Sequence, residues 1–456
     1  MILPLSLVGL FGLLALILLV SPWPYLAPGA VAALGGLLLL YRRPAWGLLA
    51  IIALVPFEGL FKDSDLSAAK LIGAGLILVL SLQLASGQLK GERLRSNLWP
   101  LLVAFLACYG LSFWASESLL MSAQHLRELS IGLLLFVMTL LIGRELNLAW
   151  LARLVCLSVA ATCVMAMFSS KYQDQGRASG LLDDPNVFAL LIAFAVPLAI
   201  WLLLNSPSLR QRLLWLACTG LLLAGMTKTE SRSGLVVLLI SLGIGLYHYR
   251  VQLTRLRPRH LGVLMLALAL LLPVAAAVMP ASYIERIQSL SVLKSGVNAH
   301  EDDSLGRRAS YIVVGGKMIR ENPLLGSGPG TFPLHYATTG YAKAFSANRK
   351  VTDLYRRAHN TYLELFSEVG IPGGVLFVGM IALALRNLWS ARAAWLQQHD
   401  VARADLLTHL CMSLLSLGLF LMFLSAPNHK YLWIMLGLSW VLRSQAEAAG
   451  RLEPRP

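Results

Sequence analysis

Long apolar runs alternate with short polar segments along the whole chain. A transmembrane helix needs about 20 apolar residues, and fourteen stretches approach or reach that length. These stretches are 3–20, 24–41, 45–61, 68–86, 98–114, 127–143, 149–168, 186–204, 213–227, 233–249, 261–280, 358–385, 404–424 and 430–444. Because several are short, and the first two and the last are the weakest candidates, the pattern predicts 12–14 transmembrane helices.

Composition supports lipid as the environment of these runs. Of the 456 residues, 57% are hydrophobic and 13% are charged, and the mean hydropathy is +0.69. Soluble domains carry about 25% charged residues, and a soluble protein with so much apolar surface would expose large patches. The five cysteines all lie inside apolar runs without a CxxC pair, which indicates neither disulfides nor a metal site. We therefore expect an all-α integral membrane protein.

The distribution of positive charge predicts the orientation. Short basic loops between transmembrane helices stay in the cytoplasm. One set of loops is basic, at 42–43, 90–95, 144, 210–212, 250–259, 386–403 and after 443. The alternate set lies at 62–67, 115–126, 169–185, 228–232, 281–357 and 425–429. The first set and both termini should be cytoplasmic, and the second set should face the other side.

The longest polar stretch, 281–357, divides the chain into three parts. Residues 1–280 form a predicted transmembrane helix bundle, 281–357 a periplasmic loop subdomain with short helices, and 358–456 the last transmembrane helices with a cytoplasmic tail. Within the loop, 307–321 has apolar residues at helical spacing and stops before Asn322-Pro323. The net charge of +15 has two competing explanations, namely membrane orientation and binding of an anionic substrate.

Two polar clusters of the non-cytoplasmic side adjoin transmembrane segments in the first half of the chain. One contains Arg177, followed by Asp183, Asp184 and a Pro-Asn helix start. A loop with a helix cap explains it as well as a binding site does, and the two aspartates lack the further ligands that a metal would need. The other cluster is the short turn 228–234, where Arg232 either reaches the lipid headgroups or binds a substrate.

Two more clusters belong to the long loop. Arg307 and Arg308 begin the predicted loop helix and could equally be a solvated pair of charges. His359 and Asn360 stand where the loop returns to the membrane, a placement that favours function over a structural histidine. The glycine-rich phrase 326–330 lacks the lysine and the strand-turn-helix context of a phosphate loop and is interpreted as a turn.

Arginines and one histidine on the same side of the membrane suit a particular chemistry. The planar guanidinium binds phosphate oxygens in pairs and stays charged, and neutral histidine is a common general base near pH 7. The set therefore favours a lipid-linked diphosphate as one substrate and a hydroxyl as the other. A transporter would instead place its ionisable residues near the middle of the membrane, so transport is the less favoured class.

At these positions the sequence resembles the O-antigen ligase family, which is grouped with O-antigen polymerases and protein O-oligosaccharyltransferases. The motif is His-Asn, nine residues and Gly-x-x-Gly, present as His359-Asn360 and Gly370-Ile-Pro-Gly373. Supporting phrases are RASGLLDDPN (177–186), TESRSG (229–234) and the segment 306–332. Tyr311 stands where relatives often have tryptophan.

The resemblance implies a function and roles for these residues. It implies transfer of a glycan from undecaprenyl diphosphate to a sugar of lipid A–core, with inversion, at the periplasmic face of the bacterial inner membrane. No metal, cofactor or nucleic acid is implied; the partners are the two lipid substrates and membrane lipid. His359 would be the general base with Asn360 in support, and Arg232, Arg307 or Arg308, and Arg177 would bind the diphosphate. An O-antigen polymerase or a protein O-oligosaccharyltransferase with the same donor remains the alternative.

Overall fold

The described part of the protein is almost entirely helical. The computed structural model describes residues 27–61, 67–174, 176–182, 184–251, 303–346 and 354–452, with a few positions before residue 27. Its one described sheet is a hairpin of β1 (Gln173–Asp174) and β2 (Arg177–Ala178), paired antiparallel. The all-α prediction is confirmed. The predicted spans 261–280 and most of 3–20 lie outside the described residues, as does the predicted domain boundary at 280/281.

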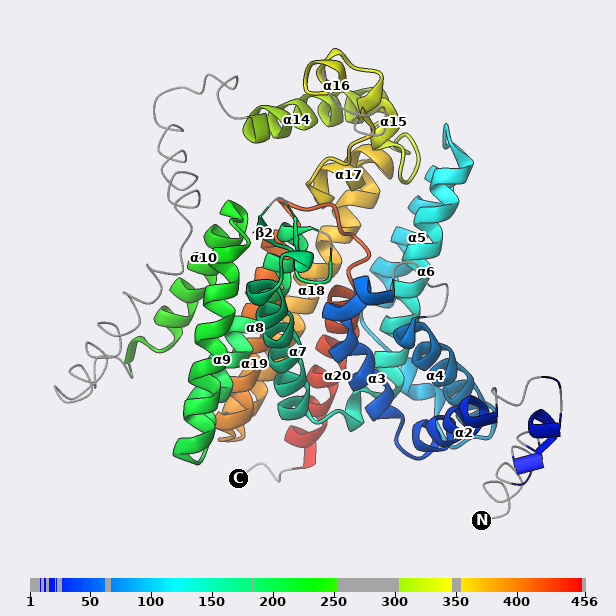
Figure 1. The fold of residues 1–456 in the computed structure, drawn as a ribbon, viewed down its shortest axis with the longest axis vertical. Helices are drawn as coiled ribbons and strands as arrows, with labels where there is room; N and C mark the ends of the chain where they lie inside the picture. The colour runs from blue at the N-terminus through cyan, green and yellow to red at the C-terminus, as the bar shows by residue number, and fades with distance from the viewer. Residues whose placement is uncertain are drawn as a thin grey trace.

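The helices follow one another along the chain with short connections (Figure 1). In the first half they are α2 (Ala27–Arg42), α3 (Pro44–Leu54), α4 (Ala68–Ala85), α5 (Trp99–Trp114), α6 (Leu119–Ile142), α7 (Leu148–Phe168), α8 (Pro185–Asn205), α9 (Leu209–Lys228) and α10 (Arg232–His248). The second half contains α14 (Asp303–Glu321), α15 (Phe332–Ala337), α16 (Gly340–Ala344), α17 (Thr361–Glu368), α18 (Gly370–Gln397), α19 (Val401–Phe420) and α20 (Lys430–Leu452). Short 3-10 helices are η2 (Val55–Phe61), η3 (Gly91–Leu94), η4 (Gly143–Glu145) and η5 (Ser170–Tyr172).

Several of these helices are long and apolar enough to cross a membrane. Within the described residues six meet that condition by length and composition, namely α4, α6 with η4, α7, α8, α18 and α19. Counting the bent pair of α2 and α3 as one span gives seven. The predicted number of 12–14 is larger because it also includes α5 and α10, which are apolar but shorter, and α9 and α20, which carry more charge. It further counts 24–41 and 45–61 separately and includes 3–20 and 261–280, which lie mostly or wholly outside the described residues. The protein is a multi-pass membrane protein.

The central helices pack into one bundle. Helix α18 contacts α5, α19 and α20, while α8 contacts α7, α9 and α19. Small residues allow close approach: a Cβ on Gly132 of α6 would lie only 2.5 Å from the buried Trp433 indole nitrogen of α20. Such interlocking of small and large side chains is how membrane helices associate, since lipid itself offers no hydrophobic driving force between them.

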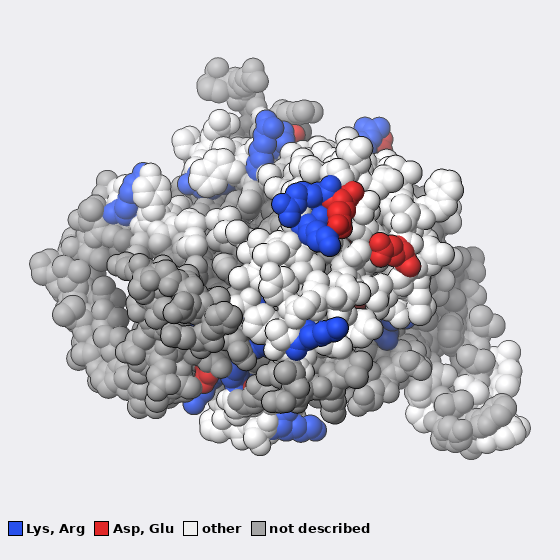
Figure 2. All heavy atoms as spheres, turned by 90° about the horizontal axis from the view of Figure 1, so that it is seen from above, with Lys and Arg blue, Asp and Glu red and all other residues white. Residues whose placement is uncertain are grey.

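The two ends of the bundle differ. Helices α14, α15, α16 and α17 stack beyond the bundle at its upper end in Figure 1 and contact one another. Seen from that end, the basic side chains form separate groups, some of them beside acidic ones (Figure 2). At the opposite end, arginine guanidinium groups lie over aromatic rings in the pairs Arg153/Trp150, Arg250/Tyr247, Arg392/Trp389, Arg403/Trp395 and Arg443/Trp440. Aromatic and basic side chains of this kind gather at membrane interfaces.

Two predicted spans are shaped differently in the structure. The predicted span 358–385 is split into α17 and α18, because Gly370 adopts a φ of 78° and its backbone lies against the Leu324 carbonyl. The predicted spans 24–41 and 45–61 correspond to α2 and α3, whose axes differ by 114° around Arg43-Pro44. The loop helix predicted at 307–321 is confirmed as α14, which ends before the Asn-Pro step.

Candidate active site

The turn between α9 and α10 meets the hairpin and the start of α8. Arg177 of β2 donates from Nε to the Thr229 carbonyl at 2.9 Å, and Ser231 Oγ donates to Asn186 Oδ1 at 2.9 Å. Ser231 also caps α10 by accepting from the Gly234 amide, which leaves Arg232 as the first residue of that helix. The two clusters predicted from the first half of the chain therefore form one unit.

The start of α8 is fixed by a cap and by close packing. Asp184 accepts a hydrogen bond from the Asn186 amide at 2.7 Å and is the N-cap of α8. Gly234 of α10 faces Ala189 of α8 so closely that a Cβ would lie 3.0 Å away. Asp183 lies outside the described residues, and among those described no group of three or more His, Cys, Asp or Glu side chains could hold a metal ion.

His359 stands immediately before α17 in a conformation that is rare for residues other than glycine. Its φ is 47°, and its ring lies 6.0 Å from that of Tyr311, tilted by 30°. Positive φ at a non-glycine residue costs free energy and is found most often at functional sites. The surrounding packing must therefore hold this backbone in place.

Burial is the main influence on the charge state of His359. It lowers the pKa of the imidazole below its ordinary value, because a buried imidazolium loses solvation. Asp184 opposes this shift and Arg308 adds to it. The neutral imidazole, which can accept a proton, is thus the favoured form at neutral pH.

The two arginines of α14 influence the pKa values of His359 and Tyr311. The positive charge of Arg308 lowers the pKa of the His359 imidazole. The positive charge of Arg307 lowers the pKa of the Tyr311 hydroxyl. Burial raises the pKa of Tyr311 and keeps its hydroxyl neutral. The structure thus brings Arg307 and Arg308 to the same region as His359 and Tyr311.

Asn360 has a structural role. Its side-chain oxygen accepts from the Leu363 amide at 3.1 Å and caps the first turn of α17. The His-Asn motif therefore consists of a titratable residue followed by the residue that starts the helix.

The comparison with known families agrees with this geometry. Residues 217–378 match the family model described as O-Antigen ligase. This part of the chain belongs to the O-antigen ligase family. The matched range contains Arg232, the two arginines of α14 and His359, whereas Arg177 precedes it. No curated protein matches the chain.

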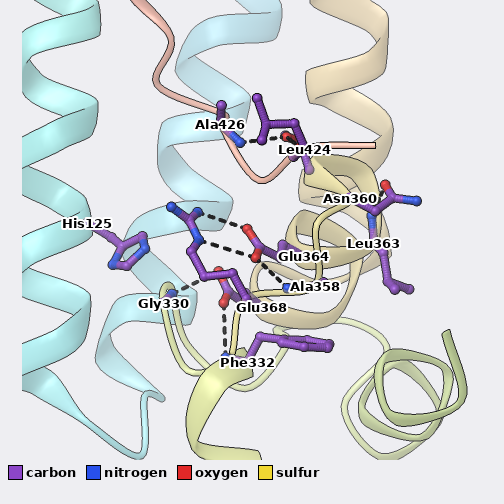
Figure 3. A network of polar contacts seen from close by, with 12 residues as sticks. His125, Gly330, Phe332, Ala358, Asn360, Leu363, Glu364, Glu368, Leu424 and Ala426 are labelled. Atoms are coloured by element: carbon purple, nitrogen blue, oxygen red, sulfur yellow. Dashed lines mark hydrogen bonds and ion pairs between the residues drawn. The ribbon is translucent and has the colours of Figure 1, made fainter. Parts of the chain in front are cut away.

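The O-antigen ligase domain contains an ion pair between a buried carboxylate and a partly exposed arginine, which the sequence analysis missed. Glu364 of α17 accepts from Arg357 through both carboxylate oxygens, at 3.3 and 2.9 Å, and from the Ala358 amide at 2.9 Å (Figure 3). Only 2% of the Glu364 side chain is exposed. Because residues 357 and 358 are held in this way, the backbone is fixed directly before His359. A carboxylate inside the otherwise apolar start of α17 was the available signal.

A second buried carboxylate holds the glycine-rich turn of the domain. Glu368 accepts from the Gly330 amide at 2.8 Å and from the Phe332 amide at 3.0 Å (Figure 3). Burial raises the pKa of Glu368 to about 8, while the two amide bonds act in the opposite direction. Gly330 has a φ of 78° and its backbone lies against the His125 ring, so no larger residue fits there. The segment 326–330, which follows α14 and was interpreted from the sequence as a turn, is therefore joined to α17 by the hydrogen bonds of Glu368.

Proposed function

We propose that this protein is an O-antigen ligase that transfers O-antigen glycan from undecaprenyl diphosphate to a sugar of lipid A–core. The observation that carries the proposal is the half-buried His359, held at a positive φ before α17 with Arg308 and Asp184 among the charged groups around it, inside a domain of the O-antigen ligase family. The reaction takes place at the periplasmic face of the bacterial inner membrane, and it uses neither a metal nor a cofactor.

In the proposed reaction one bond forms as another breaks. An acceptor-sugar hydroxyl attacks the anomeric carbon of the donor, and the bond from that carbon to the diphosphate oxygen breaks with inversion. His359 takes the hydroxyl proton as general base. Undecaprenyl diphosphate departs with the bonding electrons, so its negative charge, rather than a missing proton, is what the enzyme must stabilise.

Arginines are the groups proposed to stabilise that charge. Arg307 and Arg308 lie on α14, which contacts α17, and Arg232 follows Ser231, which is hydrogen-bonded to Asn186 at the start of α8; each guanidinium offers five donors in a planar fork. Arg177 already uses Nε to hold the Thr229 carbonyl, so its main contribution is to fix the turn that carries Arg232.

One assay tests the proposal against its alternative. Purified protein is incubated in EDTA with undecaprenyl-diphosphate glycan, either with lipid A–core or without it. Ligated lipid A–core is the expected product. Glycans that lengthen on the undecaprenyl carrier, without ligation, would instead identify an O-antigen polymerase that uses the same donor. A requirement for added divalent ions would contradict the metal-free reaction.

We expect the rate to fall on acidification only below pH 6.5, the ordinary pKa of histidine. Burial lowers the pKa of His359, so the imidazole stays neutral and active to a lower pH. Arg308→Gln removes a positive neighbour and should raise that pKa, moving the acidic limb of the rate profile to higher pH. Asp184→Asn should move it to lower pH. The measurement is the pH dependence of kcat/KM; shifts in the opposite directions would argue against His359 as the titrating group.

Orientation provides a separate prediction. Ala344 at the end of α16 and Ala402 at the start of α19 are both exposed and lie at opposite ends of the protein. In intact spheroplasts an impermeant thiol reagent should label Ala344→Cys and leave Ala402→Cys unlabelled until lysis. The reverse labelling would place the candidate active site in the cytoplasm and end the proposal.

A further inference from the structure

A cavity with both polar and apolar walls adjoins the candidate active site. Its volume is about 360 Å³. Its walls include Arg357, two residues before His359, and Leu182 and Val187, which flank Asp184 at the start of α8. The segment 425–430 between α19 and α20 forms much of the remaining wall, so we call it the 425–430 cavity. None of its lining residues is one of the four arginines assigned to the diphosphate.

Two polar atoms in this wall lack partners. Ser425 Oγ and His429 Nδ1 are buried and have no hydrogen-bond partner among the described residues. Buried polar groups are nearly always hydrogen-bonded, because an unpaired one loses its solvation without compensation. Asn428 lies between them and adds an amide, which both donates and accepts. The wall is therefore suited to a ligand that supplies hydrogen bonds of both kinds.

The charges of the cavity argue against an anionic ligand. Its two cations, Arg357 and Lys430, already pair with carboxylates: Lys430 contacts Glu58 at 2.6 Å, and Arg357 contacts Glu364 at 2.9 Å. Glu58 and Glu128 also line the cavity, so its described charged residues sum to zero. A diphosphate would meet these carboxylates, whereas sugar hydroxyls donate to carboxylates and accept from cations and amides.

We propose that the 425–430 cavity binds the acceptor sugar, a neutral polyhydroxyl ring, and presents its hydroxyl to His359. This inference rests on the proposed function and adds the place of the second substrate. The arginines lie on β2, α10 and α14, whereas the cavity is formed mainly by η2, α6, the start of α8 and the segment 425–430. The donor diphosphate and the acceptor sugar thus reach His359 from different elements, as an inverting displacement requires.

Ser425→Ala is the sharpest test because it removes a hydroxyl that makes no hydrogen bond among the described residues. The thermal stability should stay the same or rise, since an unpaired buried polar group is lost. In the ligation assay the KM for lipid A–core should rise about three- to tenfold, the worth of one hydrogen bond. The KM for the undecaprenyl-diphosphate glycan should stay unchanged. Asn428→Ala should act in the same direction.

Gln445→Ala is the matched control, because Gln445 lines a separate cavity at the opposite end of the bundle. It should change neither KM. Unchanged acceptor KM in both Ser425→Ala and Asn428→Ala, or a rise in donor KM instead, would overturn the inference while transfer by the unsubstituted protein upholds the proposed function. Absence of any glycosyl transfer by the unsubstituted protein would contradict the proposed function itself.

Discussion

Replacing His359 with glutamine should lower the rate of glycosyl transfer by about 10²–10⁴-fold, the usual contribution of a positioned general base. Glutamine can hydrogen-bond to the acceptor hydroxyl but cannot take its proton. Donor binding should persist in this variant and in His359→Ala, because the proposed diphosphate ligands remain. The measurement is kcat in the ligation assay together with binding of the undecaprenyl-diphosphate glycan.

His399 offers a matched control for this substitution. It also has a positive φ, 57°, and it lies in the connection between α18 and α19 at the other end of the bundle. His399→Gln therefore places the same residue in the same unusual backbone conformation, and it should leave the rate unchanged. Near-normal turnover by His359→Gln would make His359 a hydrogen-bonding positioner. Loss of donor binding in His359→Ala would place His359 in the diphosphate site.

Replacing Arg232 with lysine should remove most of the activity, and replacing it with alanine should reduce the rate by about 10²–10³-fold, as for other groups that stabilise developing negative charge. Lysine keeps the charge but loses the planar fork that binds two phosphate oxygens. Arg232 is held at the first position of α10, where the capped helix end offers little freedom to reposition a shorter donor set. Activity is measured in protein of equal expression and thermal stability.

Arg320 provides the control for the arginine series. It is exposed near the end of α14, the helix whose other end bears Arg307 and Arg308. Arg320→Lys should transfer glycan at the normal rate. If Arg232→Lys and Arg232→Ala are also normal, Arg232 contacts lipid headgroups rather than the diphosphate.

The fold was predictable wherever one segment contains its own signal. Apolar runs located the helices of the bundle, and the Asn322-Pro323 step marked the end of α14. The break between α17 and α18 was missed because the apolar pattern continues across it. It depends on the approach of Leu324, which is remote in sequence, to the backbone of Gly370. Periodicity within one segment contains no information about such a contact.

The residues of the candidate site were likewise predictable only where a single segment contains its own signal. Arginines and a histidine at the ends of apolar runs stand out in sequence because charge there is costly. Asn360 stood out as the neighbour of His359 in the His-Asn motif, yet its side chain caps α17. The pair Lys430–Glu58 could not be assigned, since it joins residues 372 positions apart, whereas Arg357–Glu364 joins residues only seven positions apart and was missed despite the carboxylate in α17. Opposite charges that neutralise each other inside a fold are visible only once their elements are packed together.

The hydrogen bonds of Glu368 to the turn before α15 imply an order of biogenesis. The turn at 328–332 leaves the ribosome before α17, and its partners for the Gly328, Gly330 and Phe332 amides all belong to Glu368. Helices α14 and α15 therefore cannot complete these hydrogen bonds until α17 has been synthesised. A chain truncated after α16 should insert its earlier spans and still leave α14 and α15 open to protease.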